Sequence, residues 1–251
     1  MKLKEDSSVQ KLRGAYYTPL PLAEMMVKLF ANRTDCKNLL EPSCGDGVFL
    51  DALIKADCIK QYADIDAVEI DGAEAKKVKG RMKNYKNVEV INEDFFDFYR
   101  TNKETVKYDL ILGNPPYIRY QYLEEHQRKL MSDILTAQGM KANKLVNTWV
   151  GFIVSCVNML SKNGKIAFVI PAEIMQVAYA EDLRLFLANN LSKITLITFE
   201  ELVFPDIEQE IVVFIGEKGD EEKGIRIVEL NNLEDLESFD IEANGFQKLQ
   251  H

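Results

Sequence analysis

The sequence has few cysteines, and they are not arranged as metal ligands or as disulfide partners. Its four cysteines are scattered over 251 residues, with no Cys-x-x-Cys pair and no histidine nearby. Structural zinc sites need closely spaced cysteine or histidine ligands, and disulfide frameworks belong to oxidising compartments. We therefore expect a reduced, cytoplasmic protein that holds no metal.

A membrane span is also missing. The longest apolar stretch, residues 145–160, is interrupted by four polar residues, Asn147, Thr148, Ser155 and Asn158. A span needs about 20 predominantly apolar residues, so this stretch predicts a buried helix instead. The polar start, Met1–Asp6, does not resemble a secretory signal. We expect no membrane partner.

Positive charge is in short supply. The chain has 31 Lys and Arg against 40 Asp and Glu, a net charge of -9. Residues 217–251 hold ten acids and four Lys or Arg, a net of -6, which leaves -3 for residues 1–216. Neutralisation of phosphates by Lys and Arg supplies most of the affinity of nucleic-acid binders. This balance argues against a chain that holds nucleic acid strongly on its own.

The usual phosphate-binding motifs are absent too, since neither Gly-x-Gly-x-x-Gly nor Gly-Lys-Ser/Thr occurs. A different glycine-containing loop, Glu41–Gly47, lies between a predicted strand at 38–40 and a predicted helix at 48–56. Such a loop lets a ligand approach the backbone and the free N–H groups of the helix. Glu41 and Asp46 would repel a pyrophosphate. The loop suits a ligand with positive charge, such as an amine or a sulfonium.

Two further acids end the next predicted strands, at 65–71 and 88–91. Glu69 lies where nucleotide-binding α/β units place the acid that accepts hydrogen bonds from ribose hydroxyls. Asp94 is followed by Phe95, a pair able to accept from an adenine amino group and to pack on the base. Taken alone, each acid is more often a solvated strand end than a ligand. Together, downstream of the glycine loop, they favour a bound nucleoside.

A stiff turn follows the predicted strand at 108–112. It reads Gly113-Asn114-Pro115-Pro116-Tyr117. Two consecutive prolines fix φ twice and remove two backbone donors, so the carbonyls are left to accept hydrogen bonds. With a carboxamide and an aromatic ring at its ends, the turn suits a flat group that bears an NH2. The alternative is a structural turn that ends in a surface tyrosine.

Strands alternate with helices from residue 38 to about 199, which predicts an α/β fold with a doubly wound, mostly parallel sheet. The last two strongly predicted strands, 194–199 and 210–215, are too close together for a helical crossover. We expect the last strand to be antiparallel.

Six segments follow one another along the chain: Gly14–Pro19, Glu41–Gly47, Glu69, Asp94-Phe95, Asn114–Tyr117 and Phe204-Pro205. In this order they resemble the motifs of the S-adenosylmethionine-dependent DNA adenine-N6 methyltransferases, most closely the gamma group. The resemblance covers roughly residues 13–216. It implies the Rossmann-like class I methyltransferase fold, a seven-stranded sheet with a reversed last strand.

The resemblance also implies the roles of individual residues. Asn114, Pro115, Pro116 and Tyr117 would be catalytic, and Tyr117 and Phe204 would hold a flipped adenine. The S-adenosyl-L-methionine site would be formed by Tyr17, Thr18, Glu41, Ser43, Cys44, Gly45, Glu69, Ile70, Asp94, Phe95, Asn114 and Pro116. By this resemblance, no metal would take part.

By the same resemblance, residues 1–216 form the catalytic domain and residues 217–251 an acidic extension or the start of a linker. Double-stranded DNA would be bound through a C-terminal recognition domain or a specificity partner absent from this chain. The enzyme would be site-specific and belong to a restriction-modification or related defence system in a bacterial or archaeal cytosol. Two alternatives stay open: a related methyltransferase acting on a protein glutamine amide or on RNA, and a cofactor-binding scaffold subunit without catalysis.

Overall fold

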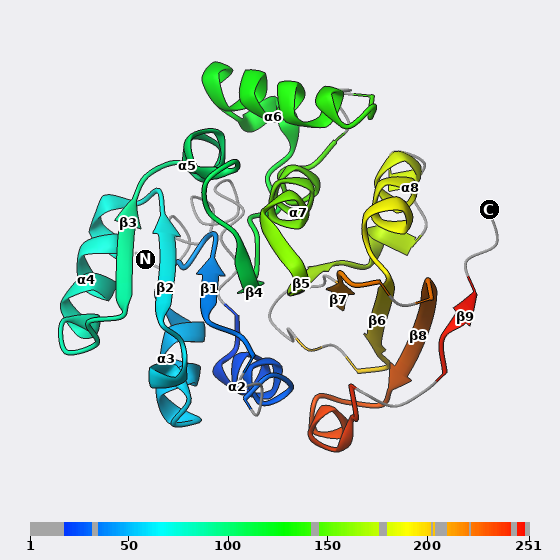
Figure 1. Cartoon of the computed structure of the whole chain (residues 1–251), viewed down its shortest axis with the longest axis horizontal. Coiled ribbons are helices and arrows are strands. Elements are labelled where there is room, and N and C mark those ends of the chain that lie inside the picture. Colours follow the sequence, from blue (N-terminus) through cyan, green and yellow to red (C-terminus); the bar gives the residue numbers. More distant parts are fainter. Residues whose placement is uncertain are drawn as a thin grey trace, which may run out of the picture.

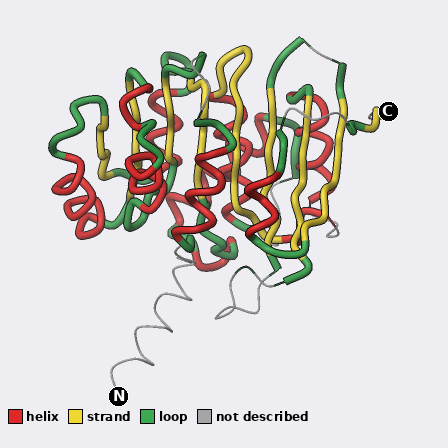
Figure 2. Tube along the Cα trace, turned by 90° about the horizontal axis from the view of Figure 1, so that it is seen from below, coloured by secondary structure: helices red, strands yellow, loops and turns green. Residues whose placement is uncertain are grey.

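The computed structural model describes residues 18–31, 35–141, 146–175, 180–201, 203, 210–220, 222–241 and 245–248. In this part of the chain, one nine-stranded sheet runs through the molecule in the order β3-β2-β1-β4-β5-β7-β6-β8-β9 (Figure 1). Figure 2 shows the strands running side by side. The strands are β1 (Asn38–Glu41), β2 (Asp64–Glu69), β3 (Val88–Asn92), β4 (Tyr108–Gly113), β5 (Leu160–Pro171), β6 (Lys193–Phe199), β7 (Ile211–Glu217), β8 (Gly224–Leu230) and β9 (Gln247–Lys248).

The directions of the strands confirm the predicted α/β fold. Strands β1 to β5 are parallel to their neighbours among themselves, whereas β7 is antiparallel to both β5 and β6. The link from β6 to β7 has no room for a crossover helix, so the chain returns as an antiparallel strand. The first seven strands thus form the predicted seven-stranded sheet with its reversed last strand.

The sheet continues beyond these seven strands. Strand β8 pairs in parallel with β6 along its whole length, from Lys193↔Gly224 to Phe199↔Leu230, and β9 pairs with the start of β8. In the sequence, residues 225–228 are a short strand-like run within an acidic segment, which gives no sign of the full pairing with β6. Its anchor is Arg226, which is buried and donates from Nε to Thr195 Oγ1 on β6 at 3.0 Å.

Helices cover both faces of the sheet (Figure 1). They are α2 (Leu20–Lys28), α3 (Val48–Lys55), α4 (Gly72–Met82), α5 (Phe95–Asn102), α6 (Glu125–Ala137), α7 (Thr148–Met159) and α8 (Glu181–Asn190), with short 3-10 turns at Ile59–Gln61, Tyr120–Tyr122, Ala172–Met175 and Glu234–Ser238. Helices α2, α3 and α4 share one hydrophobic core, and α5 to α8 share the core on the other face.

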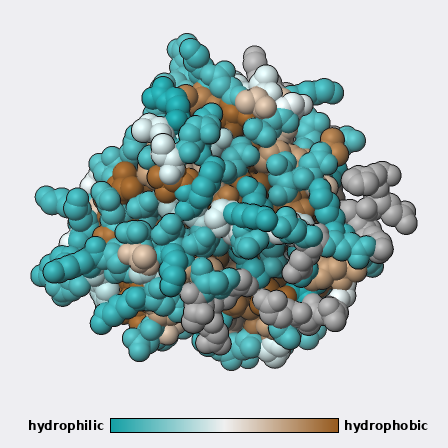
Figure 3. Space-filling model, in the orientation of Figure 1, coloured by the Kyte–Doolittle hydropathy of each residue, from teal (hydrophilic) through white to brown (hydrophobic). Residues whose placement is uncertain are grey.

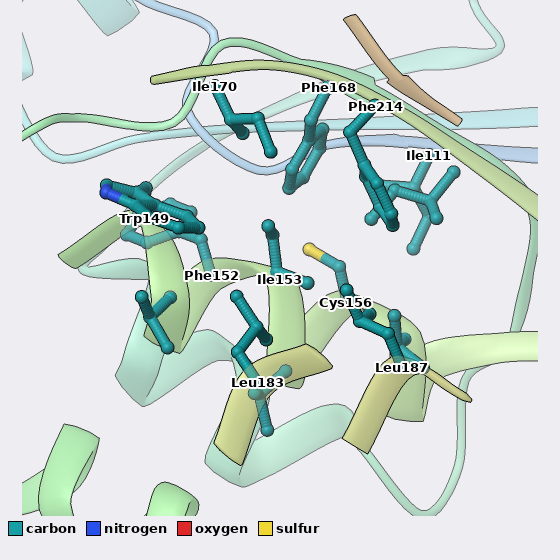
Figure 4. Close-up of a cluster of buried hydrophobic side chains, with 14 of the residues drawn as sticks. Ile111, Trp149, Phe152, Ile153, Cys156, Phe168, Ile170, Leu183, Leu187 and Phe214 are labelled. Carbon is teal, nitrogen blue, oxygen red and sulfur yellow. The ribbon is translucent and has the colours of Figure 1, made fainter. Parts of the chain in front are cut away.

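Helix α7 is the centre of the second core. Its Trp149, Ile153 and Cys156 pack toward Phe168 of β5 and Phe214 of β7 (Figure 4). The prediction of a buried helix in the longest apolar stretch is confirmed. No helix among the described residues is long and apolar enough to cross a membrane. The face of the molecule in Figure 3 is mostly hydrophilic, with hydrophobic residues in separate patches.

A buried ion pair joins β5 to β7 at the last residue of β7. Lys165 and Glu217 are cross-strand partners, with 2.5 Å between Nζ and Oε2 and side-chain exposures of 7% and 11%. Removal of one partner of a buried pair leaves the other charge without compensation, which is strongly destabilising.

We expect Lys165→Met to lower the free energy of unfolding by about 3 kcal/mol, because it leaves the Glu217 carboxylate buried. The double variant Lys165→Met/Glu217→Met should recover most of this loss, since it removes both charges. Urea denaturation of the three proteins measures the effect. Equal stability of the single and double variants would contradict the importance of the pair.

Candidate active site

The predicted motifs meet at one edge of the sheet. Glu41 and Glu69 are the last residues of β1 and β2, and Asp94 and Asn114 follow β3 and β4. These four strands are parallel neighbours, so their carboxyl ends lie at the same edge. The order of strands along the chain reverses between β1 and β4, and ligands of open α/β sheets bind at such a reversal.

The loop after β1 folds over the end of β2. The Cys44 N–H donates to the Val68 carbonyl at 2.8 Å, and the Gly45 N–H donates to Glu69 Oε2 at 2.8 Å. The Gly47 N–H closes the loop on the Cys44 carbonyl at 2.7 Å. The glycine loop and the acid of β2, 24 residues apart in sequence, are therefore one hydrogen-bonded unit.

Gly47 needs to be a glycine for two reasons. Its φ of 81° lies in the left-handed region, which strains other residues. A Cβ at this position would lie 2.8 Å from Arg81 Nη2 and 3.1 Å from Val78 Cγ1. Arg81 of α4 packs here because it donates to the Asp46 carbonyl and pairs with Asp51 at 3.2 Å. The sequence showed no sign that Arg81 supports the loop.

Glu41 is a buried carboxyl group in acidic surroundings. It is 1% exposed, and its Oε2 has no hydrogen-bond partner among the described residues. Burial raises the pKa of Glu41 well above its usual value, and the nearby carboxylates of Asp46, Glu69 and Asp51 raise it further. A cationic ligand next to Glu41 would relieve this cost, whereas an anionic one would increase it.

Glu69 is held by the backbone on both oxygens. Besides Gly45, the Asp71 N–H donates to Glu69 Oε1 at 2.7 Å. Burial raises the pKa of Glu69, although the two backbone hydrogen bonds act in the opposite direction. Each carboxylate oxygen has a second lone pair, so the group is able to accept from two further donors such as vicinal hydroxyls.

The neighbouring residue, Ile70, has a largely exposed side chain, with 59% of its surface accessible. Its turn is fixed by Asn92, whose Nδ2 donates to the carbonyls of Glu69 at 2.8 Å and of Ile70 at 3.1 Å. Ile70 thus offers a fixed apolar surface beside the Glu69 carboxylate.

Asp94 is the N-cap of α5, a helix whose bounds were not predicted. Its Oδ1 accepts from the N–H groups of Phe96 at 2.8 Å and of Asp97 at 3.4 Å. Its Oδ2 accepts from Gln127 Nε2 of α6 at 2.6 Å. Phe95 is 4% exposed and stacks on Phe152 with 4.6 Å between ring centroids, so its ring is part of the core.

The turn after β4 touches the glycine loop. Ser43 Oγ donates to the Asn114 carbonyl at 3.3 Å. Gly113 lies against the loop as well, since a Cβ there would be 3.3 Å from Pro42 Cδ. Pro115 is buried and Asn114 half-buried. The half-buried Tyr117 donates from its hydroxyl to the Val169 carbonyl of β5 at 3.1 Å.

The structure therefore brings together most residues of the predicted site. Glu41, Ser43, Cys44, Gly45, Glu69, Ile70, Asp94, Asn114, Pro115, Pro116 and Tyr117 lie along the edge formed by the ends of β1 to β4. Thr18 is buried one residue before Pro19, the N-cap of α2. Tyr17 and Phe204 lie outside the described residues. No group of three or more His, Cys, Asp or Glu in the described ranges is arranged to hold a metal ion.

The comparisons with known proteins agree with this geometry. The model of the Eco57I restriction-modification methylase family matches residues 25–204. The chain belongs to this family. The family match confirms the resemblance drawn from the six sequence motifs.

Individual relatives agree with the family. The Type II methyltransferase M.HincII of Haemophilus influenzae is 32% identical over 241 residues, which are 96% of this chain and 44% of that protein. The tRNA1(Val) (adenine(37)-N6)-methyltransferase of the same species is 30% identical over 152 residues, 59% of this chain and 60% of that protein. The chain thus spans less than half the length of M.HincII.

A solved structure shares the fold. The cryo-EM structure of a DrdV–DNA complex superposes with a TM-score of 0.76 at 14% identity, over 98% of this chain and 31% of that one. This likeness shows that the two chains share a fold over nearly the whole of this chain.

We expect Glu41→Gln to stabilise the ligand-free protein at pH 8. A carboxyl group with a raised pKa in the folded state binds more protons folded than unfolded, so its contribution to stability falls as pH rises above the unfolded value near 4.5. The substitution removes the charge that burial and the neighbouring carboxylates disfavour, so the free energy of unfolding at pH 8 should rise.

Thermal unfolding of wild type and Glu41→Gln at pH 8 and pH 4 measures this effect. The difference between the two proteins should shrink at the lower pH, where the wild-type carboxyl group is protonated in the folded state and mostly protonated in the unfolded state. The surface change Glu104→Gln serves as the control. A Glu41→Gln protein that is less stable than wild type at pH 8 would contradict the electrostatic description of the loop.

Proposed function

We propose that this chain is the catalytic part of a DNA methyltransferase that transfers a methyl group from S-adenosyl-L-methionine to N6 of adenine. The observation that carries the proposal is the contact between Ser43 and the Asn114 carbonyl. This hydrogen bond connects the Glu41–Gly47 loop, which suits a cation, with the Asn114–Tyr117 turn, which suits an amino group. A methyl donor and its acceptor need adjacent binding sites of this kind.

The residues present fit the cofactor. The buried Glu41, with one oxygen that has no partner among the described residues, suits a ligand with an ammonium and a sulfonium. We assign Thr18 and the Glu41–Gly47 loop to the methionine part, Glu69 to the ribose hydroxyls and Asp94 to the adenine amino group. When bound, S-adenosyl-L-methionine supplies a methyl group on a positively charged sulfur that leaves as a neutral thioether.

The turn after β4 would prepare the acceptor nitrogen. The lone pair of adenine N6 is delocalised into the ring, which makes this nitrogen a poor nucleophile. The Asn114 side-chain oxygen and the Pro115 carbonyl accept hydrogen bonds from its two hydrogens and favour a pyramidal nitrogen with its lone pair available. As the new N–C bond forms, N6 becomes positively charged, and these dipoles stabilise that charge. Water then takes the proton.

The base has to leave the duplex to reach this turn, and a flipped base is usually held by stacking. Tyr117 is the ring at the turn, with its hydroxyl anchored on Val169. Phe204 is our second candidate for this role. The transfer is direct, so it requires no covalent link between enzyme and substrate and no metal ion.

We further propose that recognition of double-stranded DNA depends on a C-terminal domain or a specificity partner. We also propose that the protein acts in the cytosol. Two observations support this: the net charge of -9 and the 44% share of M.HincII that the chain spans. A tight, sequence-specific DNA complex formed by these 251 residues alone would contradict it.

RNA adenine is the second candidate substrate. We keep it because a tRNA1(Val) (adenine(37)-N6)-methyltransferase is 30% identical to this chain over 152 residues. The exocyclic amine is the same in both nucleic acids, so the geometry of the turn suits either. Digestion of methylated DNA and RNA to nucleosides, followed by mass spectrometry, separates the two substrates.

We expect Asn114→Ala to lower the rate of methyl transfer by about 10²–10³-fold, the typical effect of losing one preorganised hydrogen-bond partner. Incorporation of labelled methyl groups into adenine-containing duplex DNA measures the rate. The affinity for S-adenosylhomocysteine, measured by calorimetry, should change much less than the rate.

The matched control is Asn189→Ala, an exposed asparagine of α8. It should keep the wild-type rate. Undiminished transfer by Asn114→Ala would refute the catalytic assignment, and label found only on RNA or on protein would refute the choice of DNA.

A further inference from the structure

One buried hydroxyl holds the turn after β4 from outside. Thr148 is the first residue of α7 and is 1% exposed. Its Oγ1 lies 2.6 Å from the Pro116 carbonyl oxygen and 2.9 Å from the Ile118 nitrogen. The backbone N–H of Thr148 donates to the Ile118 carbonyl at 2.9 Å. The start of α7 is thus bonded to both sides of Tyr117.

The hydrogen-bonding capacity of a hydroxyl group determines in which of these contacts Thr148 Oγ1 is the donor and in which it is the acceptor. Thr148 Oγ1 has one hydrogen to donate and two lone pairs to accept. It accepts from the Ile118 N–H and donates to the Pro116 carbonyl, its shortest contact. The Ile118 carbonyl, 3.0 Å from Oγ1, already receives the backbone N–H of Thr148. One hydroxyl therefore bridges the two peptide groups that flank the Cα of Tyr117.

The turn depends on such outside contacts because of its own sequence. Pro115 and Pro116 have no N–H, so neither is able to donate a backbone hydrogen bond that would fix the turn. Ser43 contacts the Asn114 end of the turn, and Thr148 contacts the Tyr117 end.

Helix α7 is a rigid support for this contact. Eleven of its twelve residues are buried, and the side chains that follow Thr148, including Trp149 and Phe152, pack into the core (Figure 4). Close-packed interiors transmit small displacements to their neighbours. The position of Tyr117 is thereby tied to the core of the domain.

We propose that Thr148 is a positioning residue. It fixes the position of the Tyr117 ring and the direction in which the neighbouring carbonyl groups point toward the target amine. This inference rests on the proposed function, because it concerns the same reaction. Thr148 does not touch the reacting atoms. Its effect passes through the peptide groups on either side of Tyr117.

The test compares Thr148→Val with Thr148→Ser in the full chain. Valine keeps the branched shape but removes the hydroxyl, and serine keeps the hydroxyl. We expect Thr148→Val to lower kcat about 10²-fold, the effect of a misplacement on the scale of 1 Å. The Thr148→Val protein should bind S-adenosylhomocysteine with unchanged affinity and stoichiometry. The kcat of Thr148→Ser should remain close to that of the wild type.

Hydrogen exchange of the segment 116–123 provides a readout that does not depend on activity. The Ile118 amide donates to the hydroxyl, so it should exchange faster in Thr148→Val and at the wild-type rate in Thr148→Ser. If the wild type methylates neither DNA nor RNA, the proposed function fails while this measurement still tests the contact. Wild-type kcat and unchanged exchange in Thr148→Val would overturn the role of Thr148.

A purely structural role gives a different pattern. In that case Thr148→Val would lose cofactor-binding stoichiometry in proportion to its activity, and cooling would restore both. This result, or a folded Thr148→Ser protein as slow as Thr148→Val, would also overturn the proposal.

Discussion

The site depends on the parallel pairing of β1 with β4. Leu39 and Leu40 of β1 are in register with Leu110 and Ile111 of β4, so both strands end at the same edge of the sheet. The glycine loop and the Asn114–Tyr117 turn, more than 70 residues apart, meet there through a Ser43 hydrogen bond. Gly113 allows this approach because it has no side chain to meet Pro42. A shift in this register would separate the two halves of the site.

The electrostatics of the edge work against stability. Burial raises the pKa of Glu41, Asp46 and Glu69, which means that each carboxylate destabilises the folded protein at neutral pH. Arg81 donates a hydrogen bond to the Asp46 carbonyl and forms an ion pair with Asp51, and we assign it no part in ligand binding. Acids that destabilise the free protein and suit a cation are the expected signature of a binding site.

Much of the fold and the site could be predicted from the sequence, because the signals are local. Strand ends followed by Gly, Pro or Asp gave the positions of Glu41, Glu69 and Asn114. Contacts between distant segments had no such signal. Thr148 is one polar residue in an apolar stretch, and nothing in the sequence around Gln127 marks it as a partner of Asp94. The predicted packing of Phe95 on a base is a separate case. The structure places this ring in the core, against Phe152, and the prediction stays untested.

The central claim is that the β1 loop and the β4 turn form one site for methyl donor and acceptor. A crystal structure with sinefungin, a cofactor analogue that carries an amine where the cofactor carries its methyl group, tests this claim most directly. We predict ribose hydroxyls on Glu69, the amino-acid end at the Glu41–Gly47 loop, and the amine directed toward Asn114. An analogue bound elsewhere, or with its amine directed away from Asn114, would contradict the account.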